Sequence, residues 1–191
     1  LDFGSFVSPK AIPQLKDTAE VLEQLNPSDT KLLAIIANER GAQEASSHER
    51  ISILGYPFSI SETFQKRNTN HSLDASLKLM EQVSETCEQN KKQLRVYLSM
   101  GFGNPYGDTW SEDLLCTWVD RLNTHFPIHD FALSDTIAVA TDAQCSTLFH
   151  TLFKHFPKQT FSAHFHVVPG QEQGLIQAAY EAGCQHFDTA I

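Results

Sequence analysis

The sequence predicts an α/β fold with a parallel sheet that closes into a barrel. Short runs rich in β-branched and aromatic residues alternate with longer segments in which apolar residues recur about every 3.6 positions. Because parallel neighbours need crossovers, and crossovers are usually helices, this alternation indicates a parallel sheet. No G-x-G-x-x-G motif follows the first strand, and Gly101-Phe-Gly103 lacks that spacing. An eight-stranded β/α (TIM) barrel is therefore favoured over a doubly wound open sheet.

Seven segments have the length and composition of strands. They are Leu1–Val7, Leu32–Ala37, Ile51–Ile60, Leu94–Ser99, Asp130–Leu133, Phe161–Val167 and His186–Ile191. An eighth strand would fit upstream of Leu1. We therefore expect residues 1–191 to form a single incomplete barrel domain that lacks the first strand and the region after the last strand.

Helices are predicted between the strands by capping residues and apolar stripes. One covers Thr18–Leu25 and ends at Asn26-Pro27, because the residue before proline disfavours helix. Three more follow Ser72, Ser111 and Thr141, which are residue types preferred at the N-cap. A last helix ends at Gly183, as expected for a glycine just after a helix.

The composition excludes several classes of partner. The chain has 14 Lys and Arg against 23 Asp and Glu, a formal net charge of −9, which disfavours nucleic acid and anionic membrane surfaces. No apolar run approaches the roughly 20 residues of a spanning helix. The four cysteines form no C-x-x-C pair, which is typical of reduced thiols in a cytosolic protein.

The segment Phe161-Ser-Ala-His-Phe-His166 is the most informative strand end. Alternation along a strand places His164 and His166 on one face and the aromatic residues on the other, which suits the helix layer. Barrel enzymes work at the carboxyl ends of their strands, so two imidazoles on the inner face predict a divalent metal site. The alternative is a pair of hydrogen-bonded core histidines. Asp2 and Asp135, at the ends of other strands, add oxygen donors, a set that suits Mg²⁺, Mn²⁺ or Zn²⁺.

Other strand ends carry polar or flexible residues. Ser61 and Glu62 follow the third strand, and the glycine-rich stretch Ser99–Gly107 predicts a tight loop after the fourth. Four basic residues just beyond strand ends could hold phosphate or carboxylate groups, although solvated surface charges are the alternative. These are Lys10, Arg40, Lys66 and Arg67.

Five motifs in order resemble the 3-hydroxy-3-methylglutaryl-CoA lyase family of pyruvate-carboxylase-like, or DRE-TIM, metallolyase barrels. The motifs are Ser5-Phe-Val-Ser-Pro-Lys10 with Pro13-Gln14, Ser61-Glu-Thr-Phe64 with Asn68-Thr-Asn70, Phe102-Gly-Asn-Pro-Tyr106, Ser134-Asp-Thr-Ile137 and His164-Phe-His166. They cover nearly the whole chain.

The resemblance implies a metal-dependent carbon–carbon lyase that cleaves 3-hydroxy-3-methylglutaryl-CoA to acetyl-CoA and acetoacetate, as in leucine degradation. It implies Mg²⁺ or Mn²⁺, with Zn²⁺ as the alternative, held by His164 and His166. The implied catalytic residues are Asp135, His164 and Asp2, although Asp2 stands where many relatives have Glu. The implied substrate contacts for an acyl-CoA are Ser61, Glu62, Asn68 and Lys10. We expect a homodimer, bacterial and cytoplasmic, or in the mitochondrial matrix of a eukaryote.

Three departures from the family pattern stand out. In the family, the first barrel strand ends in an Arg-Asp motif and a cysteine-bearing loop follows the region that matches the end of this chain. Both are absent from these 191 residues. Relatives commonly read Asp-Thr-Tyr-Gly after the second histidine, whereas here Val167-Val-Pro-Gly170 follows. Alone, these 191 residues are predicted to be inactive. The alternatives are a related Claisen-type synthase of the same superfamily and a non-catalytic barrel that serves as a binding module.

Overall fold

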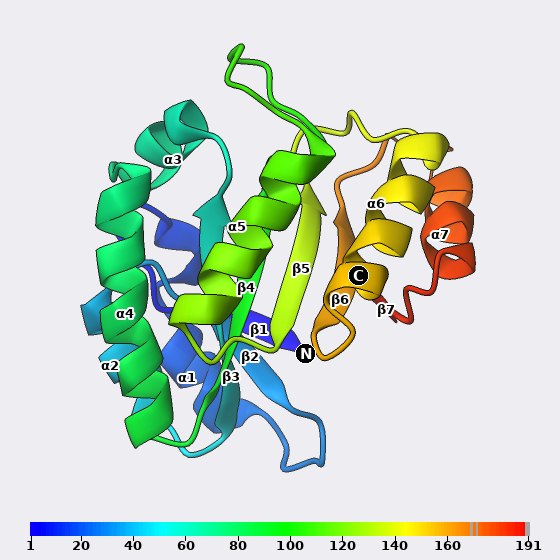
Figure 1. Ribbon diagram of the computed structural model, residues 1–191. Coiled ribbons are helices and arrows are strands. Elements are labelled where there is room, and N and C mark those ends of the chain that lie inside the picture. The colour runs from blue at the N-terminus through cyan, green and yellow to red at the C-terminus, as the bar shows by residue number, and fades with distance from the viewer. Residues whose placement is uncertain (169, 171, 190–191) are drawn as a thin grey trace. The chain divides into compact units, whose positions relative to one another are not determined.

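The computed structural model describes residues 1–168, 170 and 172–189 and has the predicted α/β fold (Figure 1). One sheet contains the strands in chain order, from β1 to β7. They are β1 (Asp2–Ser5), β2 (Leu32–Ile35), β3 (Ile51–Ser59), β4 (Gln93–Ser99), β5 (Asp130–Asp135), β6 (Thr160–Phe165) and β7 (His186–Phe187). All seven predicted strands are thus confirmed, most of them shorter than predicted. The expected continuation of the last strand through Ala190 and Ile191 lies outside the described residues.

Helices connect the strands, as parallel pairing requires. They are α1 (Thr18–Gln24), α2 (Glu39–Ser46), α3 (Glu62–Thr69), α4 (Leu73–Gln89), α5 (Glu112–His125), α6 (Asp142–His155) and α7 (Glu172–Glu181), with a 3₁₀ turn at Pro13–Leu15. Ser111 and Thr141 cap α5 and α6 as predicted, since their side chains accept hydrogen bonds from Leu114 N and Gln144 N. Gly183 has φ +104°, the left-handed conformation expected after a helix.

The sequence did not reveal α2 and α3. The buried residues of α2 are Gly41, Ala42, Ala45 and Ser46, and α3 buries only Gln65. Neither helix buries a large apolar side chain, and recurring large apolar residues were the pattern that identified the other helices.

The chain divides into two compact units, which are described separately. The first unit comprises residues 1–57 and 74–95. In it β1 pairs in parallel with β2, and β2 with β3. Two cations tie its loops: Arg50 donates to the carbonyls of Leu22 and Asn26, and Lys92 donates to those of His48 and Ile51.

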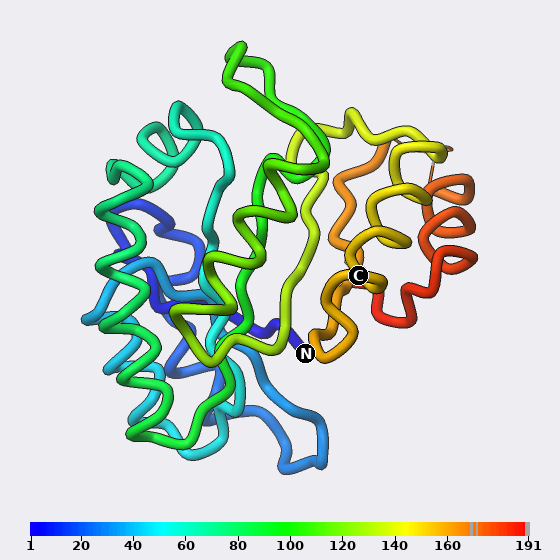
Figure 2. Tube along the Cα trace, in the orientation of Figure 1, coloured from blue at the N-terminus to red at the C-terminus, as the bar shows by residue number. Residues whose placement is uncertain are grey.

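The second unit comprises residues 58–73 and 96–191. In it β5 pairs in parallel with β6, and β6 with β7. An aromatic cluster fills the space between this part of the sheet and α6: the Phe161 ring stacks on Phe131 and meets Phe153 edge-on. Figure 2 shows the loop between β4 and α5 projecting past the start of α5. Within the described residues, no helix combines the length and apolarity needed to cross a membrane.

Candidate metal centre

The histidine face of the second unit is built by strand register. Residues paired across parallel strands point to the same side of a sheet, and β5 pairs Ser134 with His164. The register of β6 and β7 pairs Ala163 with Phe187, so Asp188 follows beside His164. The predicted alternation along β6 is confirmed, because Phe161 packs toward α6 while His164 lies on the opposite face.

The two imidazoles face each other through their Nε2 atoms, which are 3.3 Å apart. Each Nδ1 faces an acceptor instead: His164 Nδ1 lies 2.9 Å from Asp188 Oδ2, and His166 Nδ1 lies 3.1 Å from the Thr136 carbonyl oxygen. A carboxylate and a carbonyl can only accept, so each Nδ1 carries the hydrogen and each neutral ring keeps its lone pair on Nε2.

The two histidines differ in their surroundings, because His164 is packed and partly buried whereas His166 faces solvent. The Tyr97 ring, from β4, meets the His164 ring edge-on with centroids 5.2 Å apart. His164 and Asp188 are partly buried, with side-chain exposures of 31% and 25%, whereas His166 is exposed. The rings are therefore held in place yet remain accessible from solvent.

The donor set of this site fits a divalent cation. The lone pairs of the two Nε2 atoms repel each other at this separation unless a proton or a cation lies between them. Histidine residues that bind metals through one ring nitrogen usually donate the N–H of the other nitrogen to a carboxylate or a carbonyl, as both Nδ1 atoms do here. Among the described residues no group of three or more His, Cys, Asp or Glu could hold a metal ion together. The described chain thus offers two nitrogen ligands, and the other coordination positions would belong to water, substrate or further residues.

Asp135 lies apart from the histidine nitrogens. It pairs in register with Phe165, whose ring packs against Phe102 and Phe149, so its side chain is on the helix side of the sheet. Its carboxylate is buried and accepts hydrogen bonds from Val139 N at 3.0 Å and Ala140 N at 2.9 Å. Both oxygens are therefore engaged in anchoring the loop after β5.

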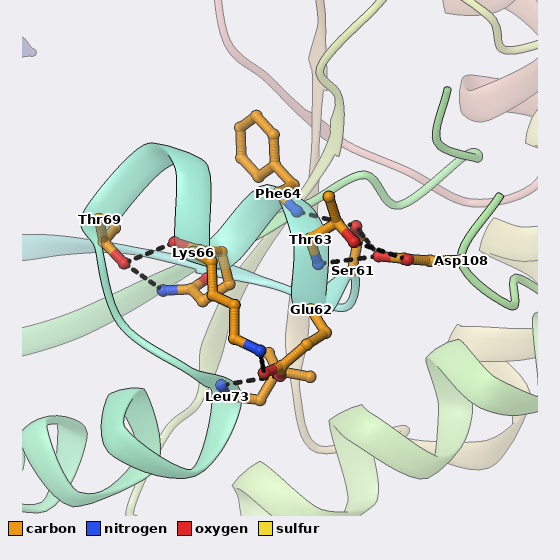
Figure 3. A network of polar contacts seen from close by, with 9 residues as sticks. Ser61, Glu62, Thr63, Phe64, Lys66, Thr69, Leu73 and Asp108 are labelled. Carbon is orange, nitrogen blue, oxygen red and sulfur yellow. Dashed lines mark hydrogen bonds and ion pairs between the residues drawn. The ribbon is translucent and has the colours of Figure 1, made fainter. Parts of the chain in front are cut away.

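Ser61 and Glu62 belong to a polar network at the start of α3 (Figure 3). Ser61 caps α3 by accepting from Phe64 N, and its hydroxyl donates to Asp108 Oδ2. Asp108 also accepts from the backbone N and the hydroxyl of Thr63. The carboxylate of Glu62 accepts from Leu73 N and pairs with Lys66 at 2.7 Å. Both predicted substrate contacts thus already serve the architecture of this loop.

Charge and hydrogen bonding stabilise both carboxylates of this network. Donation by Ser61 and Thr63 holds the pKa of Asp108 below its ordinary value. The Lys66 ammonium and the Leu73 amide likewise lower the pKa of Glu62. Both groups are therefore ionised at neutral pH and act as acceptors only.

The glycine-rich loop after β4 lies against this network. Asn104 Oδ1 accepts from the backbone amides of Tyr106 and Asp108, and its Nδ2 donates back to the Asp108 carbonyl. The guanidinium of Arg67 lies over the Tyr106 ring, 4.8 Å from its centroid. The predicted tight loop is thus a hydrogen-bonded loop fastened to α3.

The remaining predicted residues are surface positions. Asn68 is exposed on α3. Asp2, in β1, and Lys10, in the segment that follows it, are exposed residues of the first unit. Their roles in catalysis and substrate binding stay predictions. Sequence reasoning missed Asp188, Asp108 and Tyr97. Asp188 lies within the predicted strand His186–Ile191 and directly follows β7, so its place on that strand was the available signal.

Comparisons with known proteins find relatives named hydroxymethylglutaryl-CoA lyase. No protein-family model matches the chain. The chain is 30% identical to the 3-hydroxy-3-isohexenylglutaryl-CoA/hydroxymethylglutaryl-CoA lyase of Pseudomonas aeruginosa, over 100% of the chain and 63% of that protein. It is 31% identical to a hydroxymethylglutaryl-CoA lyase of Bacillus subtilis, over 98% of the chain and 62% of that protein. It therefore spans somewhat less than two thirds of these curated relatives.

Solved structures give the same result. An HMG-CoA lyase from Acinetobacter baumannii, in complex with coenzyme A and 3-methylmalate, matches the whole chain and 62% of its own, with TM-score 0.90 and 30% identity. The carboxyl transferase domain of Rhizobium etli pyruvate carboxylase shares the fold at TM-score 0.64 and 15% identity. The resemblance expected from the motifs is thus confirmed: along its length the chain is a homologue of the hydroxymethylglutaryl-CoA lyases, with the α/β barrel fold of that group.

Proposed function

We propose that the protein is a metal-dependent carbon–carbon lyase that cleaves 3-hydroxy-3-methylglutaryl-CoA to acetyl-CoA and acetoacetate, the reaction of leucine degradation. The supporting observation is the pair of Nε2 atoms 3.3 Å apart, with each Nδ1 held by an acceptor. The proposal takes Mg²⁺ or Mn²⁺ as the cation, with Zn²⁺ as the alternative.

A bound divalent cation would polarise substrate oxygens and stabilise the negative charge that develops as the carbon–carbon bond breaks. His164 and His166 would hold it, and Tyr97 would limit rotation of the His164 ring. In such a cleavage a base takes the proton of the 3-hydroxyl group. The sequence predicts either Asp135 or His164 as that base. The Asp135 carboxylate accepts hydrogen bonds from Val139 N and Ala140 N, and we propose that it also holds the loop that supplies the Thr136 carbonyl.

The substrate assignment draws on the relatives. Their printed names include both the methylglutaryl and the isohexenylglutaryl thioester, and one solved relative contains coenzyme A with 3-methylmalate. We therefore propose an acyl-CoA carrying a tertiary 3-hydroxyl group as the substrate class. The relatives are named cytoplasmic in the rat and mitochondrial in the chicken, and we propose the cytoplasm. The homodimer stays a prediction that sedimentation analysis would test.

The test is acetoacetate release from 3-hydroxy-3-methylglutaryl-CoA by the complete gene product, with Mn²⁺ and then with a chelator. We expect metal-dependent release. His164→Ala should abolish it while leaving the fold intact, because the substitution removes one of the two nitrogen ligands. His150→Ala is the matched control, since His150 is exposed on α6, and should keep full turnover.

Two outcomes would contradict the proposal. Parent-like turnover in His164→Ala would remove the metal assignment. No release from folded, metal-loaded protein would reject this substrate, and acetyl-CoA condensation assays would then test the synthase alternative.

A further inference from the structure

We infer that Asp188 is a positioning residue: its carboxylate fixes the proton of His164 on Nδ1 and so directs the Nε2 lone pair toward the cation. The inference rests on the proposed function, because metal binding gives this role its purpose. The tautomer of His164 can nevertheless be measured without any assay of turnover. Nothing in the motifs of the sequence points to Asp188.

The backbone determines where this carboxylate lies. The amide of Asp188 donates to the Ala163 carbonyl at 2.9 Å, which extends the β6–β7 pairing one residue beyond the end of β7. In parallel pairing the residues that follow a paired couple face the same side. Asp188 is therefore held beside His164 by strand register, and its Oδ2 reaches Nδ1 at 2.9 Å.

The chemistry of the contact selects one tautomer. An ionised carboxylate has no hydrogen to donate, so the bond forms only when Nδ1 carries the proton. With Nδ1 protonated, Nε2 of the neutral ring is unprotonated and can bind a cation. A carboxylate partner also makes an imidazole a stronger ligand than a neutral partner does. His166 has only the Thr136 carbonyl in the equivalent place, so the two ligands are unequal.

The surroundings of Asp188 strengthen this effect. The carboxylate is 25% exposed and His164 is 31% exposed, so solvent screens the pair only in part. Tyr97 meets the His164 ring edge-on at 80° between planes, which opposes a ring flip that would exchange Nδ1 and Nε2. The orientation of the ring is thus set from two sides, by a charge and by packing.

The first experiment reads the tautomer directly. Long-range ¹H–¹⁵N correlation spectra of histidine-labelled, metal-free protein, recorded above the imidazole titration range, distinguish Nδ1–H from Nε2–H. We expect the His164 signals of the parent protein to show Nδ1–H. A parent protein with Nε2–H at His164 would overturn the inference without any variant.

Asp188→Asn then tests the cause. The amide has the same size but can either accept or donate, so it no longer enforces one tautomer. We expect a mixture of tautomers at His164 and Mn²⁺ affinity weaker by about tenfold or more, measured by electron paramagnetic resonance titration. Asp188→Glu, which keeps the carboxylate, should restore Nδ1–H, and Asp120→Asn, an exposed carboxylate on α5, should change neither readout.

The outcomes separate this inference from the proposed function. An unchanged His164 tautomer and unchanged Mn²⁺ affinity in Asp188→Asn would overturn the positioning role. A parent protein with the expected tautomer that binds no Mn²⁺ would contradict the metal-dependent reaction and leave the assignment of Asp188 standing.

Discussion

At the scale of single residues, burial governs the chemistry of the thiols. Cys87, Cys145 and Cys184 are buried, and Cys116 is half-buried on α5. Burial raises the pKa of Cys87 and Cys145 to about 12 and also raises that of Cys184 and Cys116. Thiolates are the reactive form of cysteine, so none of these thiols is activated in the folded protein.

We therefore predict that iodoacetamide labels the native protein slowly and at Cys116 first, because only that thiol is partly exposed. The measurement is a timed alkylation at mildly alkaline pH followed by peptide mass spectrometry, with guanidinium-unfolded protein as the control in which all four react. Native labelling of Cys145 at the rate of Cys116 would show that α6 opens far more readily than its packing implies.

Gly101, in the second unit, lies where a loop and a strand approach closely. A Cβ built on Gly101 would lie 2.6 Å from Leu133 Cδ1 and 3.1 Å from the Leu98 carbonyl oxygen. The amide of Gly101 also donates to the Ser134 carbonyl at 3.0 Å. Ser134 pairs with His164, so the absence of a side chain at position 101 helps to hold the strand end beside the histidines.

At the scale of elements, one carboxylate joins two segments that are distant in sequence. Asp108, in the loop before α5, accepts three hydrogen bonds from Ser61 and Thr63 at the start of α3. The first amides of a helix have no partner within the helix, and here a distant loop supplies one. The loop after β4 is thereby fastened to α3.

Asp108→Asn should loosen this attachment, because an amide presents only one accepting oxygen to three donors. We expect the amide of Thr63 to exchange with solvent several-fold faster, corresponding to about 1 kcal/mol for a lost hydrogen bond. Hydrogen exchange measured by NMR checks this, with Asp113→Asn in the first turn of α5 as the control. Unchanged exchange at Thr63 would mean that the Ser61 cap alone holds the helix start.

The pH dependence of the same contact has a definite sign. The folded-state pKa of Asp108 is lowered from 3.8, so its contribution to stability is complete above that value. It is lost as pH falls through the lower folded pKa. The exchange rates of the Thr63 amide in the parent protein and in Asp108→Asn should therefore become equal in strong acid and differ increasingly as pH rises past 3.8. A difference in these rates that persists in strong acid would show that the geometry of the side chain, and not its charge, causes the effect.

At the scale of the whole molecule, stability depends on the cores of its units. In the second unit the fully buried Phe161 contacts Phe131, Phe153 and Phe156 between the sheet and α6. Phe161 also precedes His164 on β6. The aromatic face of this strand therefore supports the strand whose other face carries the histidines.

Phe161→Ala should reduce the free energy of unfolding by about 3–5 kcal/mol, through lost burial and the cavity left behind. Tyr180→Ala is the matched control, because Tyr180 on α7 is 65% exposed, and should change stability by less than about 0.5 kcal/mol. Urea unfolding followed by circular dichroism measures both. Equal effects of the two substitutions would show that the aromatic cluster does not form the core of this unit.

Local patterns in the sequence determined the strands, five of the helices and the shared face of the histidine pair. Each depends on a period of two or about 3.6 residues, or on a capping residue beside its helix, and such signals are present in a short window. The same windows did not reveal α2 and α3, because the residues that these helices bury are small or polar and form no stripe of large apolar side chains. Motif order alone pointed to the lyase homologues.

Tertiary structure alone decided the partners of the site residues. Asp188 meets His164 24 positions away, Thr136 meets His166 30 positions away, and Asp108 meets Ser61 47 positions away. It also placed Asp135 with Phe165 on the helix side, away from the histidine nitrogens. The physical reason is register: pairing between strands sets which side chains become neighbours, and it is fixed by the packing of the folded chain, which no short stretch of sequence contains.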